Sequence, residues 1–95
     1  MKTLTIGGEV ELDFAAAKRL ADAAAAALLG DQTACLSWYD RPSRHECPAN
    51  ASECHDGACP MPGYVEYAAS RGAQLRVDVA QGAYVFCYRS IAEFA

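Results

Sequence analysis

The amino-acid sequence predicts an α+β domain, a two-layer sandwich in which two helices lie on one face of a mainly antiparallel sheet of about four to five strands. Two observations predict this class. Residues 14–29 form an alanine-rich run of good helix formers, and alternating segments on either side of Gln81 and Gly82 have the period of a β-hairpin. A chain of 95 residues holds one modest core, so we expect residues 1–95 to fold as a single domain.

The first third of the chain predicts a β-hairpin followed by the long helix. Residues 3–6 are β-branched or apolar, two glycines follow, and apolar residues then alternate with acidic ones. Asp13 is a suitable N-cap for a helix over residues 14–29, because its carboxylate can accept a hydrogen bond from the first helical turn. Gly30 stands where such a helix commonly ends.

The middle of the chain predicts a strand, a loop and a second, shorter helix. Residues 33–39 alternate in a way that puts Leu36 and Trp38 on the core side of a strand. Residues 63–71 have the composition of a short helix, and Gly72 follows them as its expected C-terminal stop.

The last two strands form the predicted hairpin, with Gln81 and Gly82 as its turn. This register places the following apolar side chains on the core face of the sheet: Leu75, Val77, Val79, Tyr84, Phe86 and Tyr88. By the same alternation Cys35 and Cys87 share the outer face, where they would face each other across neighbouring strands or line a dimer interface.

Residues 40–61 show neither helical nor strand period and form a cysteine-rich loop within the domain. Structureless loops of this length are uncommon in small domains and are often functional. The loop contains the two histidines of the chain and three of its five cysteines: His45, Cys47, Cys54, His55 and Cys59. We therefore expect the functional site here.

Zinc is the cofactor that these residue types favour, since cysteine sulfur and histidine nitrogen are its usual protein ligands. The favoured ligands are His45, Cys47, His55 and Cys59, with Cys54 replacing His55 as the main variant. Their spacing differs from the Cys-x₂₋₄-Cys knuckles on which structural zinc sites are usually built.

A thiol site centred on Cys59 is the other hypothesis. A cysteine just before a helix lies near backbone N–H groups that lack intrahelical partners and near the positive end of the helix dipole, and both favour the thiolate. Cys54 is then a suitable resolving partner, able to close a small disulfide loop. The residues expected to form the helix start around this thiol are Pro60, Pro62, Gly63 and Tyr64.

The segment CPMP at residues 59–62 resembles the Cys-Pro-x-Pro motif of the small sulfur-carrier (sulfurtransferase) family. The resemblance implies that Cys59 carries a persulfide. In that family, however, the motif lies near the start of the domain and opens a longer helix. We prefer a sulfur-carrier or redox role centred on Cys59, and the alternative is a zinc-binding loop in a structural or partner-binding module without catalysis.

Three further segments, SWYDR, SECHDG and PGYVEYAASRGAQLRVD, look like pieces of a small prokaryotic α+β domain family whose function is uncharacterised. That resemblance covers more of the chain and implies the same α+β fold. It assigns no role to any residue.

The composition argues against several classes of function. The formal net charge is −4 and the eight Lys and Arg residues are scattered, which disfavours binding to nucleic acid or to a membrane surface. No apolar run is long enough for a membrane span or a signal sequence, so we expect a cytoplasmic protein with reduced thiols. The expected partners are a protein, such as a sulfur donor or acceptor, or a second copy in a homodimer. No Ser-His-Asp set, phosphate-binding glycine loop or HExxH helix decides between an enzyme and a binding module.

Overall fold

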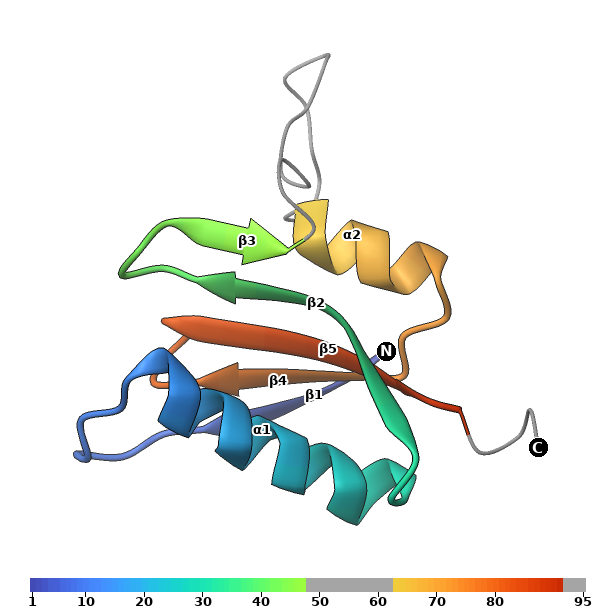
Figure 1. Ribbon diagram of the computed structural model, residues 1–95, viewed down its shortest axis with the longest axis horizontal. Coiled ribbons are helices and arrows are strands. Elements are labelled where there is room, and N and C mark those ends of the chain that lie inside the picture. Colours follow the sequence, from blue (N-terminus) through green and yellow to red (C-terminus); the bar gives the residue numbers. More distant parts are fainter. Residues whose placement is uncertain (48–62, 92–95) are drawn as a thin grey trace.

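The computed structural model describes residues 1–47 and 63–91. In chain order the elements are β1 (Lys2–Ile6), α1 (Phe14–Leu29), β2 (Thr33–Asp40), β3 (His45–Cys47), α2 (Gly63–Ser70), β4 (Leu75–Val79) and β5 (Tyr84–Ser90). The strands form one sheet in the order β1-β4-β5-β2-β3 (Figure 1). β1 pairs in parallel with β4, and the other neighbouring strands are antiparallel. The described residues thus confirm the predicted α+β class with a mainly antiparallel sheet.

The long helix begins and ends where the sequence predicts. The Asp13 carboxylate accepts a hydrogen bond from the Ala16 N–H at 2.8 Å, as an N-cap does. The helix ends at Gly30, whose positive φ of 99° is a conformation that suits glycine. Ala17, Ala21 and Ala25 are fully buried, and their small side chains let the helix backbone lie close to the sheet.

The β4–β5 hairpin also has the predicted register. Val77 lies opposite Phe86, and Val79 lies opposite Tyr84. The connection is a tight turn in which the Ala83 N–H donates to the Ala80 carbonyl at 3.1 Å. Gly82 adopts a φ of 83° there, which explains why glycine occupies this position.

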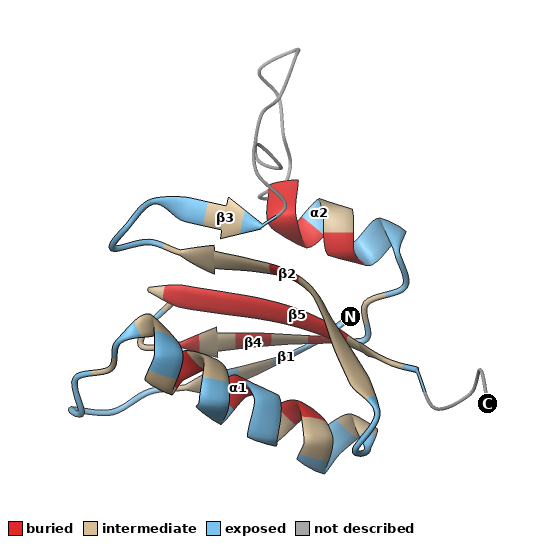
Figure 2. Ribbon diagram, in the orientation of Figure 1, coloured by how far each residue is buried: buried red, intermediate tan, exposed pale blue. Residues whose placement is uncertain are grey.

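The two helices cover opposite faces of the sheet, so the prediction that both lie on one face is wrong. α1 packs on the face that carries Val77 and Phe86, whereas α2 packs on the face that carries Val85 and Cys87. Residues 84–88 of the central strand β5 are buried without interruption (Figure 2). Because β5 is apolar on both faces, each face needs a helix to cover it, and the domain has three layers instead of two.

A β-bulge in β2 changes which of its side chains share a face. Cys35 lies opposite Tyr88 and Ser37 lies opposite Cys87, with Leu36 between them. The extra residue reverses the alternation of the strand, so Leu36 packs toward α2. Cys35 and Cys87 consequently do not face each other, and both are free thiols. The predicted cross-strand pair of cysteines is therefore wrong.

The prediction of an N-terminal hairpin is also wrong. β1 pairs with β4, and residues 7–13, which follow β1, form no strand. Conversely, β3 lies inside residues 40–61, which the sequence predicts to be loop throughout. Its three residues pair with the end of β2. Within the part of the chain that the structure describes, no helix has the length and apolarity needed to span a membrane.

Candidate functional site

The structure describes four of the predicted site residues, His45, Cys47, Gly63 and Tyr64. The other five lie outside the described residues: Cys54, His55, Cys59, Pro60 and Pro62. The described site residues stand on either side of residues 48–62, hereafter the cysteine-rich segment, on β3 before it and on α2 after it (Figure 1).

His45 and Cys47 are exposed residues of the edge strand β3. Side chains two positions apart on a strand project to the same side, so the imidazole and the thiol share one face. His45 pairs across the ladder with Asp40, and Cys47 pairs with Trp38. The His45 Nδ1 lies 3.1 Å from the Ser43 hydroxyl. Among the described residues, no group of three or more His, Cys, Asp or Glu side chains converges on a metal-sized site.

The first turn of α2 is buried and fixed to the sheet. Gly63, Tyr64 and Val65 are all buried. The buried Ser37 hydroxyl donates to the Tyr64 carbonyl at 2.6 Å, and the Tyr64 ring stacks on Tyr39 with centroids 5.1 Å apart and an interplanar angle of 8°. β2 therefore sets the position of the helix start to which the cysteine-rich segment leads.

Ser37 is not among the site residues that the sequence predicts, because simple alternation places it on the outer face of the strand, where no hydrogen-bond partner is expected. The signal in the sequence was a serine between the apolar residues Leu36 and Trp38, since a hydroxyl that becomes buried requires a hydrogen-bond acceptor. Ser37 bonds to the backbone of Tyr64. The phenol of the same tyrosine has a raised pKa, mainly because burial penalises its charged form. The phenol is thus a neutral packing group at neutral pH.

The cysteines of β2 and β5, Cys35 and Cys87, are poor nucleophiles. Burial raises the pKa of Cys35 to about 11, and burial likewise raises the pKa of Cys87. The Cys35 Sγ donates to the Ser37 carbonyl at 3.4 Å. Because the thiolate is the reactive form, both residues are packing groups at neutral pH.

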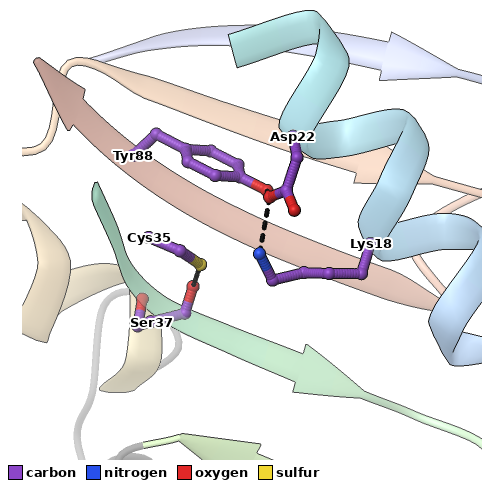
Figure 3. A network of polar contacts seen from close by, with 5 residues as sticks. All are labelled: Lys18, Asp22, Cys35, Ser37 and Tyr88. Atoms are coloured by element: carbon purple, nitrogen blue, oxygen red, sulfur yellow. Dashed lines mark hydrogen bonds and ion pairs between the residues drawn. The ribbon is translucent and has the colours of Figure 1, made fainter. Parts of the chain in front are cut away.

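A polar network joins α1 to β5 on the other face of the sheet (Figure 3). One oxygen of the Asp22 carboxylate accepts from the Lys18 ammonium at 2.5 Å and from the Tyr88 hydroxyl at 2.6 Å. The Lys18 nitrogen also lies 5.6 Å from the centroid of the Tyr88 ring. The Tyr88 phenol is 1% exposed, and its pKa is raised first by burial and then by donation to Asp22. The network keeps a buried hydroxyl satisfied and holds α1 in register on the sheet.

The sequence shows only part of this network. Lys18 and Asp22 stand four positions apart on one helix, where opposite charges attract. The contact of Asp22 with Tyr88 cannot be predicted from local sequence, because it forms only when α1 packs on the folded sheet. The thiol nearest to it, Cys35, stays protonated, so the cluster has no activated nucleophile.

Comparison with known proteins supports the fold. In a search of solved structures, the crystal structure of AF1514, a protein of Archeoglobus fulgidus described as novel, matches with a TM-score of 0.71. The match covers 98% of this chain and 98% of that chain at 22% sequence identity, a level at which the likeness concerns the fold alone. No curated protein matches the sequence.

A family model described as a domain of unknown function, DUF5619, matches residues 1–88. Neither match is described as a sulfur carrier, so neither supports the resemblance of residues 59–62 to that family. Because the family model spans nearly the whole sequence, the chain belongs to the DUF5619 family.

Proposed function

We propose that the domain is a scaffold for thiol chemistry in the cysteine-rich segment, with Cys59 as the reactive thiol and Cys54 as its resolving partner. The observation that carries the proposal is the fixed, buried first turn of α2. Ser37 and Tyr39 hold Tyr64 at that turn, and Cys59 precedes it by a few residues in the sequence.

The helix start favours a nearby thiolate for two reasons. The first N–H groups of a helix have no intrahelical acceptor, and they lie at the positive end of the helix dipole. The N–H groups of Gly63, Tyr64 and Val65 belong to this turn. A sulfur that accepts from them has a lowered pKa and is a better nucleophile near neutral pH.

The low reactivity expected of Cys35 and Cys87 also supports Cys59 as the reactive thiol. Cys35 and Cys87 have raised pKa values because they are buried, so they do not compete for electrophiles. Reactivity is then left to the thiols of β3 and the cysteine-rich segment. A cytosolic location, where reducing conditions keep thiols free, and a sulfur donor or acceptor protein as partner complete the proposal.

In a sulfur-carrier reaction, the Cys59 thiolate attacks the outer sulfur of a donor persulfide, and the donor leaves as a thiolate. Intact-mass spectrometry after incubation with a low-molecular-weight persulfide tests this step. We expect a gain of one sulfur atom that a reductant removes, that survives in Cys47→Ser, and that disappears in Cys59→Ser. A gain that is unchanged in Cys59→Ser would reject Cys59 as the carrier.

Zinc binding is a second candidate, which the geometry of β3 favours. His45 and Cys47 are exposed on the same face of the strand, so both are accessible to one ion as two of its four ligands. His55 and Cys59 would supply the others, with Cys54 as the variant in place of His55. Native mass spectrometry of protein purified without chelators should then show one zinc ion per chain, lost in Cys47→Ser but retained in Cys35→Ser. A metal-free spectrum from zinc-supplemented protein would exclude this candidate.

A further inference from the structure

The outer edge of β1 presents backbone groups that no other strand of the described residues satisfies, since β1 stands at the end of the sheet. The Lys2 N–H donates to Gln74, and the Ile6 carbonyl accepts from Ala80. In a parallel ladder alternate residues bond to the same neighbour. The N–H and C=O groups of Thr3 and Thr5 therefore point away from the sheet.

Apolar side chains flank this edge on the α1 face. Leu20 and Leu28 of α1 are 42% and 59% exposed. A hollow of about 180 Å³ separates Leu20 from Ile6 near the end of β1, and a second one of about 640 Å³ separates Leu28 from Leu4 near its start. The edge of β1 together with Leu20 and Leu28, here named the β1 margin, is an exposed sheet edge with exposed apolar side chains beside it.

We propose that the β1 margin binds a second copy of this chain, with the two β1 strands paired antiparallel about a two-fold axis at Leu4. Leu4 then faces Leu4 of the second copy. Thr3 faces Thr5 of the second copy, and the reverse pair forms on the other side of the axis. Within each Thr pair, the N–H group of each residue donates to the carbonyl of the other. The outward backbone groups of both β1 strands are therefore hydrogen-bonded in the dimer.

The rest of the margin is self-complementary under the same axis. The axis is perpendicular to the sheet, so both α1 helices stay on the same face of one continuous sheet. Leu28 lies near the start of β1 and Leu20 near its end. An antiparallel arrangement therefore turns the Leu20 side of one copy toward the Leu28 side of the other, which is the relation that an isologous interface requires.

Charge favours a second copy in this orientation as well. Lys2 is the charged residue of β1, and Glu9 and Glu11 follow the other end of the strand. Within the described residues these three side chains form no ion pair. The antiparallel arrangement brings the basic start of β1 toward the acidic segment of the second copy, whereas a parallel one would bring like charges together.

Light scattering coupled to size-exclusion chromatography tests the interface. The wild type should elute with the mass of a dimer. Thr5→Pro should raise the dissociation constant at least about tenfold, because it removes an outward donor in each copy and places a ring at the edge. Thr5→Ala, which keeps the N–H, should remain dimeric. A monomeric wild type, or a Thr5→Pro dimer of unchanged affinity, would overturn the proposal.

Cross-linking tests the register without depending on a proline. Leu4→Cys places two thiols across the axis, at the spacing of directly opposite residues, and should form a disulfide-linked dimer under mild oxidation. Lys2→Cys places its two thiols several residues apart along the strands and should cross-link no more than the wild type. Equal cross-linking of the two variants would reject this register. Both cysteine variants carry Ser in place of Cys47, Cys54 and Cys59, so the cross-links do not involve these thiols. Failure of this proposal therefore leaves the proposed function intact.

Discussion

Removing the Tyr88 hydroxyl measures how much the α1–β5 network contributes to stability. Tyr88→Phe leaves the ring in place and deletes only the donor to Asp22, which it meets at 2.6 Å. A hydrogen bond to a charged group contributes about 1.5 to 3 kcal/mol. The Asp22 side chain is 50% exposed and keeps Lys18 and water as partners, so we expect the lower end, about 1.5 kcal/mol.

The matched control is Tyr84→Phe. The Tyr84 hydroxyl donates to the uncharged Leu12 carbonyl at 3.0 Å, and a neutral bond of this kind contributes about 0.5 to 1.5 kcal/mol. Urea unfolding monitored by circular dichroism gives both free energies of unfolding. For a domain of this size, the Tyr88→Phe cost corresponds to a fall in melting temperature of about 6 to 12 °C.

A double-mutant cycle with Asp22→Ala isolates the pair from other effects of each substitution. We expect a coupling energy of about 1 kcal/mol between Tyr88 and Asp22. If Tyr88→Phe lowers the free energy of unfolding no more than Tyr84→Phe does, or if the coupling energy is indistinguishable from zero, the bond between Tyr88 and Asp22 does not hold α1 on the sheet.

Three other predictions follow from the packing and from the buried thiols. Phe86→Ala should cost about 3 to 5 kcal/mol in urea unfolding, because the ring is fully buried beneath α1; a loss below about 1 kcal/mol would contradict this packing. Stability should fall as pH rises from 9 toward 11, since Cys35 has a folded pKa of about 11 against an ordinary value of 9.0. A group whose pKa is raised on folding contributes stability that is complete below its unfolded pKa and is lost as pH rises through its folded pKa. Cys35→Ala should therefore reduce the fall in melting temperature over this pH range, and an unchanged fall would contradict the assignment to Cys35. Ser37→Ala should cost about 1 kcal/mol by removing the bond to α2; an unchanged stability would show that this bond does not fix the helix.

The elements with strong local signals were predictable from the sequence. The helix over Phe14–Leu29 follows from its composition and from Asp13 and Gly30 at its ends. The β4–β5 register follows from alternation around one glycine-containing turn. In each case the determining interactions are close in sequence, so the pattern alone contains them.

The arrangement of these elements in space depends on contacts between distant residues. Val85 and Cys87 occupy the face that we expected to be open, and only the position of α2 shows that they belong to a second core. The bulge at Cys35 depends on the pairing of β2 with β5, and β1 finds its neighbour β4 about 70 residues further along the chain. For the candidate site, the sequence indicated cysteines and histidines but not Ser37, whose partner on α2 is distant in sequence.

The reactivity of Cys59 relative to the other thiols is the most direct test of the proposed function. Alkylation rates measured across pH, with peptide mapping of all five cysteines, rank the thiols by thiolate content. We expect Cys59 to label fastest at mildly acidic pH, and Cys35 and Cys87 to label slowest because burial raises their pKa values. Ser37→Ala should slow the labelling of Cys59 by loosening the start of α2. If Cys59 labels no faster than Cys47 or Cys54 at mildly acidic pH, the helix start does not activate it and the thiol function is contradicted.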